Sequence, residues 1–147
     1  MTALKAFFRA DWPFRRLLLE VLILLGVGRL SVLVFPFKKI AGWMGQVQEE
    51  TLEELSEAHR QSLVRLASAI LAVSKYTPWN SNCFAQALCA HWVLKRRGWS
   101  HTIYFGVKKE EHKLMKAHAW LRMGNKIVTG RVGHKQYTVL SKFAYLP

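Results

Sequence analysis

The spacing of apolar residues changes at Gly98, and this change constrains the fold of the chain more than any other feature. Before Gly98, apolar residues recur every three or four positions, which predicts helices. After it, segments rich in β-branched and aromatic residues predict strands, and Gly124 with Asn125 suits a tight hairpin turn between two of them. Helices followed by strands with short connections predict an α+β fold with an antiparallel sheet.

Turn and capping residues set the expected limits of these elements. Thr51 and Glu54 form a possible capping box near the start of a long helix that ends before Pro78. Pro36 ends an earlier helix, and Gly98 is the expected stop of a later one. The predicted helices are 48–76 and about 83–97, with a short piece near 40–44, and the predicted strands are 101–107, 116–123, 126–130 and 136–143.

Residues 17–35 form the most apolar stretch of the chain. The stretch is nearly long enough to span a bilayer, but Glu20 and Arg29 interrupt it at a high cost for a membrane segment. A buried pair of helices is therefore the favoured interpretation, and membrane association through residues 12–39 is the alternative. Gly26 and Gly28 mark either the bend between the two helices or a close helix contact.

Length and charge predict one domain with a basic second half. The chain has 147 residues, of which 51% are hydrophobic, so one domain over 1–147 is expected, with an apolar helical lead-in at 1–45 and the core at 46–147. Lys and Arg balance Asp and Glu at seven each up to residue 59, whereas residues 60–147 hold fifteen against two. This excess favours an anionic partner such as nucleic acid, a membrane surface or an acidic peptide, unless it only solvates the surface.

Cys83 stands between a turn and a predicted helix, in the stretch TPWNSNCFAQALCAHW. Asn82 just before it is a good N-cap residue, and the unpaired N–H groups of a helix N-terminus favour a thiolate. Cys89, six positions later on the same helix, points elsewhere, so neither a disulfide nor a metal site is expected, and a reducing, cytoplasmic setting fits. The alternative is that Cys83 is an ordinary buried thiol.

A nucleophilic cysteine needs a base, and His118 has the best context for that role. It stands in Ala-His-Ala-Trp, where strand alternation places His118 and Trp120 on the same face. His91 lies about 12 Å from Cys83 along the predicted helix, which is too far for proton transfer. Surface positions are expected for His59 and His112, while His101 and His134 have no strong context. The alternative for His118 is a hydrogen-bonded core histidine.

The segments PWNSNCFAQALCAHWVLKRRGW, IYFGVKK, AHAWLRMGNKIVTG and YTVLSKF resemble the leader peptidases of lasso-peptide biosynthesis, which are papain-like proteins of the transglutaminase-like superfamily. The stretch from LLLEVLILLGVGRL to LVFPFKK resembles their helical lead-in, so the similarity covers nearly the whole chain. The resemblance implies N-terminal helices and then a papain-like core, in which the helix that carries the nucleophile packs on an antiparallel sheet. It implies a cysteine endopeptidase without a cofactor.

The resemblance also implies partners. The substrate is the leader of a ribosomally made precursor, and a separate ATP-dependent cyclase closes the new N-terminus onto an acidic side chain. A separate leader-recognition protein is expected, because the chain has no room for the leader-binding domain that some members carry. Nucleic acid is not an expected partner on this view. The competing interpretation is a basic module without catalysis that binds nucleic acid or a membrane surface.

Residue roles carried over from the family begin with Cys83 as nucleophile and His118 as the base that takes its proton. The family's third member is an aspartate about a dozen residues after the histidine, but no acidic residue follows Glu111 here. Asn125, Thr129 or a backbone carbonyl remains to orient His118, and Thr129 lies nearest the expected position.

Three further residues complete the expected site. The N–H of the nucleophilic cysteine and the polar side chain of Asn82 are candidates for the oxyanion site that acyl transfer needs. Trp79 and Trp120 are expected to contact the substrate. No metal ligand is expected among these residues.

Overall fold

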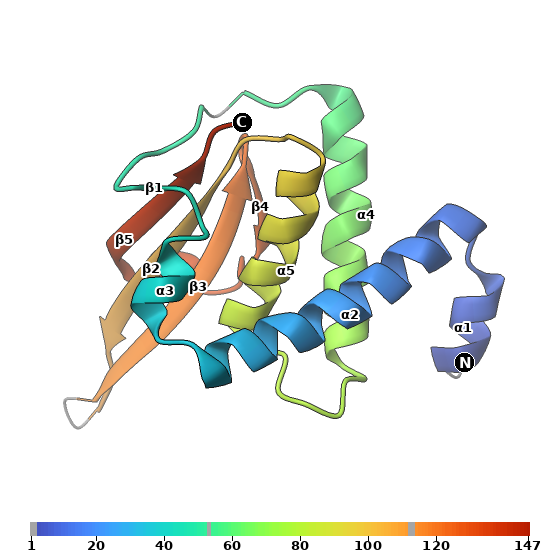
Figure 1. Ribbon diagram of the computed structural model, residues 1–147, viewed down its shortest axis with the longest axis horizontal. Coiled ribbons are helices and arrows are strands. Elements are labelled where there is room, and N and C mark those ends of the chain that lie inside the picture. The colour runs from blue at the N-terminus through green and yellow to red at the C-terminus, as the bar shows by residue number, and fades with distance from the viewer. Residues whose placement is uncertain (1–2, 53, 112–113) are drawn as a thin grey trace.

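The computed structural model describes residues 3–52, 54–111 and 114–147, so His112 lies outside the described residues. The helices are α1 (Ala3–Arg9), α2 (Trp12–Val34), α3 (Phe37–Ala41), α4 (Glu57–Ser74) and α5 (Cys83–Arg96). The strands are β1 (Gln46–Val47), β2 (His101–Lys109), β3 (Met115–Met123), β4 (Lys126–Thr129) and β5 (Thr138–Tyr145), with a short 3-10 helix η2 (His134–Gln136) before β5. The predicted α+β class is confirmed (Figure 1).

The strands form one five-stranded sheet in the order β1-β5-β2-β3-β4, with antiparallel pairing throughout. β2 and β3 pair along their whole length, and Gly106 lies opposite His118. The predicted hairpin between β3 and β4 is present, and Gly124 supplies the positive φ of 58° that its turn requires. β4 pairs with β3 only at residues 121–123. At His118, the edge of β3 is therefore no longer paired with β4.

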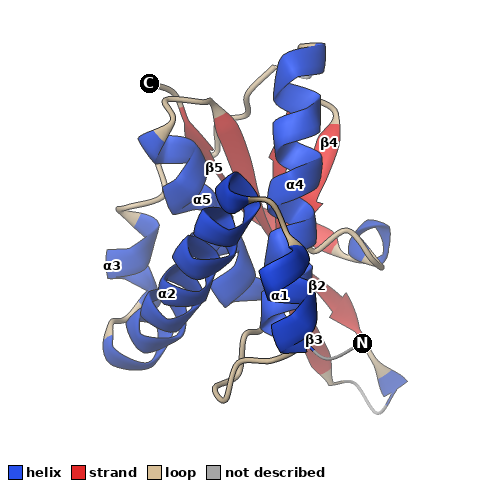
Figure 2. Cartoon of the chain, turned by 90° about the vertical axis from the view of Figure 1, so that its right-hand side faces the viewer, coloured by secondary structure: helices blue, strands red, loops and turns tan. Residues whose placement is uncertain are grey.

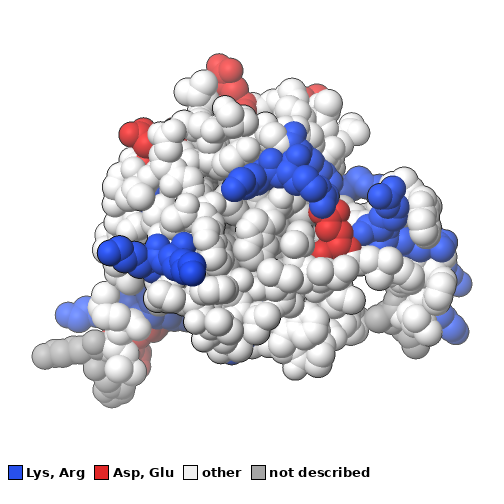
Figure 3. Space-filling model, viewed as in Figure 1, with Lys and Arg blue, Asp and Glu red and all other residues white. Residues whose placement is uncertain are grey.

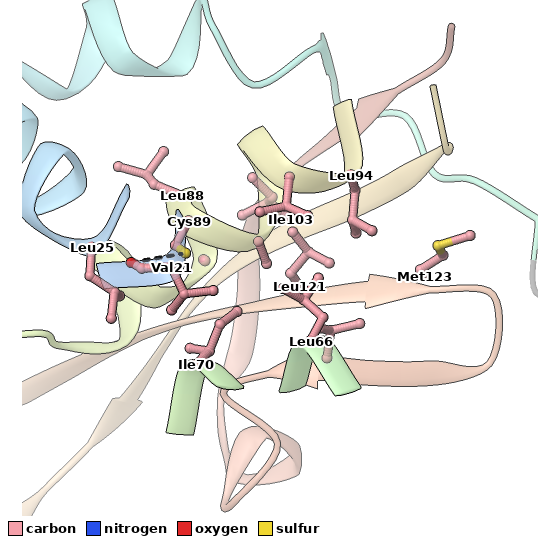
Figure 4. Packing of buried hydrophobic residues seen from close by; sticks show 14 of the residues in the cluster. Val21, Leu25, Leu66, Ile70, Leu88, Cys89, Leu94, Ile103, Leu121 and Met123 are labelled. Carbon is pink, nitrogen blue, oxygen red and sulfur yellow. Dashed lines mark hydrogen bonds between the residues drawn. The ribbon is translucent and has the colours of Figure 1, made fainter. Parts of the chain in front are cut away.

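Three helices cover one face of this sheet (Figures 1 and 2). α5 packs on β2, β3 and β4, while α2 and α4 pack on α5 and on each other. The core between helices and sheet includes Val21, Leu25, Leu66, Ile70, Leu88, Cys89, Leu94, Ile103 and Leu121 (Figure 4). Side chains of β3 alternate as expected, so Ala119, Leu121 and Met123 enter this core while His118 and Trp120 lie on the opposite face.

The apolar run forms one continuous helix of 23 residues, so the expected pair of helices is wrong. The side chain of Asp11 caps its start, and Pro36 follows its end as predicted. No bend occurs at Gly28, because the backbone there packs closely on α5. A Cβ at this position would lie 3.2 Å from the carbonyl oxygen of Ala85. The alternative of a close helix contact is therefore confirmed.

The long helix after residue 48 starts later than predicted. It begins at Glu57 with Ser56 as its N-cap, and the capping box at Thr51 does not form. Instead, Thr51 crosses to β2, where its backbone N–H donates to the hydroxyl of Thr102 at 3.0 Å. The buried guanidinium of Arg122 donates to the carbonyl oxygen of Thr51. These tertiary bonds replace the local capping bonds that the sequence favours.

Candidate active site

Cys83 is the first residue of α5, as the sequence predicts. Asn82 is the N-cap, and its side-chain oxygen accepts a hydrogen bond of 3.0 Å from the backbone N–H of Ala85. The backbone N–H of Cys83 has no hydrogen-bond partner among the described residues, so it remains available to a ligand. The cysteine side chain is half-buried at the edge of the core. This end of α5 therefore presents a thiol and a backbone donor side by side.

The turn before Cys83 is held by its own hydrogen bonds. The hydroxyl of Thr77 donates to the carbonyl oxygen of Trp79 at 3.0 Å and lies 2.8 Å from the hydroxyl of Ser81. From the first turn of α5, the amide of Gln86 donates back to the carbonyl oxygen of Ser81 at 2.9 Å. These bonds fix the path of the chain into the helix, and the sequence pattern did not point to Gln86.

His118 is oriented by a backbone carbonyl. Its Nε2 lies 2.7 Å from the carbonyl oxygen of Gly130, which can only accept, so Nε2 carries the proton. In the neutral ring, Nδ1 then holds the free lone pair, and it has no hydrogen-bond partner among the described residues. The imidazole is flanked by the rings of Trp120 at 5.7 Å and Tyr137 at 5.0 Å. The site thus holds a basic nitrogen with a defined tautomer.

Gly130 can occupy this position because it lacks a side chain. Its φ is +71°, and a Cβ there would lie 2.4 Å from the carbonyl oxygen of Ala119. The backbone therefore passes close to β3 directly after β4 ends, which brings the Gly130 carbonyl to His118. A backbone carbonyl is one of the partners expected for His118 from the sequence, but no residue pattern points to Gly130.

Thr129 and Asn125 do not orient His118 in this structure. The hydroxyl of Thr129 is buried and has no hydrogen-bond partner among the described residues. The side-chain oxygen of Asn125 accepts from Arg60 on α4 at 3.1 Å, beyond the hairpin turn. The carbonyl of Gly130 takes the place that the sequence analysis gave to Thr129.

The two tryptophans expected to contact substrate have packing partners within the protein. Trp120 is only 4% exposed and stacks on Tyr104 at 5.5 Å, so it supports the ring of His118 and leaves little surface for a substrate. Trp79 packs over α2, where a Cβ on Gly26 would lie 3.3 Å from its ring. Trp120 is therefore a packing residue, whereas Trp79 is half-buried and its predicted contact with substrate stays a prediction.

No hydrogen bond joins Cys83 to His118 within the described part of the chain. Cys83 belongs to the helical layer, while the ring of His118 lies on the far face of β3, near the uncovered edge of the sheet. Proton transfer between them therefore requires the imidazole to move from the far face of β3 toward the N-terminus of α5, which is more than the tightening of a long hydrogen bond. The structure therefore presents a partly accessible thiol and an imidazole with one free nitrogen on opposite sides of the sheet, without a direct bond between them.

The other buried cysteine and histidines are held in the core. Burial, and then the charge of Glu20, raise the pKa of the Cys89 thiol. His91 and His101 are fully buried, with Nδ1 of the first 2.8 Å from Nε2 of the second, and the other nitrogen of each lies at hydrogen-bond distance from a backbone carbonyl, of Trp43 and Trp99 respectively. Because both carbonyls only accept, two neutral rings can supply the proton for only two of these three contacts. Burial lowers the pKa of His91 to about 3 and that of His101 to about 4. The sequence analysis missed this pair, which stabilises the packing of α5 on β2.

A metal centre has no support among the described residues, because no group of three His, Cys, Asp or Glu side chains could hold an ion there. Comparison with known proteins gives one match. The family model of the Transglutaminase-like superfamily matches residues 31–142, a range that includes Cys83, His118 and Gly130. No curated protein and no solved structure matches the chain.

Proposed function

The chain belongs to the transglutaminase-like superfamily, and we propose that it is a cysteine endopeptidase that removes the leader from a ribosomally made lasso-peptide precursor. The superfamily includes cysteine peptidases and transglutaminases, so it supports cysteine-based chemistry in general. The observation that carries the proposal is the bond from His118 to Gly130, because it leaves Nδ1 of the ring as a free base. The resemblance to lasso leader peptidases supplies the substrate class.

The proposed reaction proceeds through an acyl-enzyme. The ring of His118 first moves from the far face of β3 to reach the thiol. Cys83 Sγ then attacks the scissile carbonyl carbon as its proton passes to Nδ1 of His118, and the backbone N–H of Cys83 donates to the resulting oxyanion. The C–N bond then breaks, and the leaving amine takes the proton from His118. Water, deprotonated by the same nitrogen, hydrolyses the thioester and releases the leader with a new carboxylate.

A neutral third partner distinguishes this site from one with an aspartate. The carbonyl of Gly130 fixes the orientation and tautomer of His118, but it stabilises the imidazolium less than a carboxylate does. We therefore expect slower turnover than in superfamily members that have the acid.

The proposed partners are a separate leader-recognition protein and an ATP-dependent cyclase, with the reaction in the cytoplasm. The excess of positive charge in residues 60–147 is suited to attracting an acidic leader or partner. If this attraction matters, raising the salt concentration will slow processing.

The test is cleavage of a candidate precursor in the presence of its leader-recognition partner, followed by mass spectrometry. Wild type is compared with Cys83→Ala and His118→Ala. The matched controls are Cys89→Ala, on the same helix, and His134→Ala, whose ring also contacts Trp120. A single defined cut that is lost in the first two variants and kept in the controls supports the proposal. A cut that persists in Cys83→Ala, or no cut by wild type when precursor and partner bind, contradicts it.

A further inference from the structure

The outward side of α2 is largely apolar, with Arg16 as a charged interruption between Trp12 and Leu19. Trp12, Leu19, Ile23, Val27, Leu30 and Val34 follow one another at intervals of three, four or seven residues and are each between 43% and 65% exposed. The opposite side of the same helix, with Leu17, Val21 and Leu25, is buried in the core. A surface helix normally turns a polar side to water, so this outer stripe requires another explanation.

Phe8 of α1, before the start of α2, is 60% exposed and adds to this apolar surface. Phe37 of α3 does not, because its ring packs on Phe84 and Phe105. Figure 3, seen from the same side as Figure 1, shows uncharged surface over much of α2, with an acidic side chain flanked by Lys or Arg beside its middle and further Lys and Arg at the edges. We call this surface the α2 face: the six exposed apolar residues of α2 together with Phe8.

Charge around the α2 face is positive. Arg9 and Arg16 lie near the start of α2, Lys38 and Lys39 follow its end, and all four are exposed. The acidic residues of this region are neutralised, because Asp11 pairs with Arg65 at 2.8 Å and Glu20 pairs with Arg96. An apolar stripe with basic residues at both ends complements an anionic lipid surface.

An open hollow lies within the α2 face. It is lined by Arg16, Leu19, Glu20, Ile23, Leu24 and Arg96. Arg16 has no ion-pair or hydrogen-bond partner among the described residues, so its guanidinium is free to meet a phosphate. Leu19 and Ile23 beside it are suited to the first methylene groups of an acyl chain.

We propose that the α2 face docks in the plane of an anionic lipid bilayer, with α2 parallel to the surface. α2 is long and apolar enough to cross a membrane, but its inner side packs on α4 and α5. Insertion across the bilayer would uncover Val21, Leu25 and the contact of Gly28 with Ala85. A helix that lies in the interface keeps these contacts and buries only the outer stripe.

A second copy of the chain is a poorer occupant of this face. Two α2 faces brought together around a twofold axis would place their basic residues against one another without acidic partners. Anionic headgroups instead complement those residues. The proposal does not depend on the peptidase activity.

The experiment measures co-sedimentation of the full chain with phosphatidylcholine vesicles, with and without phosphatidylglycerol. In Ile23→Gln/Leu30→Gln, two exposed side chains at the centre of the α2 face become polar. The matched control is Leu52→Gln/Val132→Gln, whose side chains are 79% and 93% exposed outside that face. Circular dichroism confirms that all proteins are folded.

We expect wild type and the control to bind the anionic vesicles, and the α2 variant to bind at least about tenfold more weakly. Lys38→Gln and Lys39→Gln should each weaken binding about fivefold at low salt. Failure of wild type to bind anionic vesicles, or equal binding by the α2 variant, overturns the proposal. A dimer in solution that the α2 variant converts to monomer also overturns it, because a second copy then covers the face.

Discussion

Two cysteines on α5, six positions apart, occupy opposite environments. Cys83 is half-buried at the N-terminus, beside a backbone N–H without a partner among the described residues. Cys89 is fully buried, its thiol points to the carbonyl oxygen of Val21 at 3.9 Å, and its pKa is raised (Figure 4). The difference shows that the position along α5, rather than the residue type, decides whether a thiol is partly accessible or enclosed.

His91 and His118 differ in the same way as the two cysteines. Both ring nitrogens of His91 are engaged, with His101 and with the carbonyl oxygen of Trp43, so the ring has no nitrogen left for chemistry. His118 bonds Gly130 through one nitrogen and keeps the other free. The N-terminus of α5 leaves a thiol partly accessible, and His118 on β3 leaves one ring nitrogen without a partner among the described residues, whereas the middle of α5 is enclosed in the core.

The largest predicted effect separates the two cysteines. Cys83→Ala should lower the rate of leader cleavage about a thousandfold or more, because the attacking atom is lost, and leave the free energy of unfolding nearly unchanged. Cys89→Ala should keep cleavage and lower the free energy of unfolding by about 1 kcal/mol, because it opens a small cavity. Cleavage assays and urea denaturation measure both quantities. Equal losses of cleavage in the two variants would contradict the assignment of Cys83 as nucleophile and Cys89 as a core residue.

Lowering the pH should reduce the stability of the folded protein through the buried rings of His91 and His101. The pKa of His91, about 3, and that of His101, about 4, lie below the ordinary value of 6.5 because both rings are buried. As the pH falls below 6.5, the unfolded chain therefore binds protons first, and folded-state stability declines. The free energy of unfolding should fall by up to about 1.4 kcal/mol per pH unit for each ring.

Urea titrations between pH 7 and pH 5, with NMR of the histidine rings, provide the measurement. The rings of His91 and His101 should remain neutral throughout this range. A stability that does not change with pH, or protonation of both rings by pH 5, would contradict the buried environment.

Gly130→Ala tests whether the carbonyl of Gly130 orients His118. The new Cβ would collide with the carbonyl oxygen of Ala119, and a φ of +71° strains any L side chain, so we expect a loss of about 2 to 3 kcal/mol in stability. Displacement of the carbonyl should also slow cleavage about tenfold. Gly133→Ala is the control, because its φ is +77° but nothing lies within 4 Å of the added Cβ. Equal effects of the two changes on cleavage would exclude a role of the Gly130 carbonyl.

The smallest predicted effect concerns Thr129. Thr129→Val removes a buried hydroxyl that has no partner among the described residues, so stability should stay constant or rise by up to about 1 kcal/mol. Cleavage should be unchanged. A large drop in cleavage with intact folding would instead return Thr129 to the third catalytic position.

Local signals explain which parts could be predicted from the sequence. Gly98, Pro36 and Gly124 act through backbone geometry, and Asn82 caps the very next helix, so each was correctly placed. Thr51 shows the limit, because its bonds to Thr102 and Arg122 outweigh a plausible local cap. The bond from Gly130 to His118 depends on a backbone oxygen that residue types do not reveal.

The most direct test of the central claim is the alkylation rate of Cys83, measured by iodoacetamide labelling and peptide mapping of the folded protein. Cys89 is the internal reference, and His118→Ala is compared with His134→Ala. We predict that Cys83 reacts at least about tenfold faster than Cys89, and that His118→Ala slows it while His134→Ala does not. If Cys83 reacts at the same rate with and without His118, the two residues do not act together and the peptidase account is contradicted.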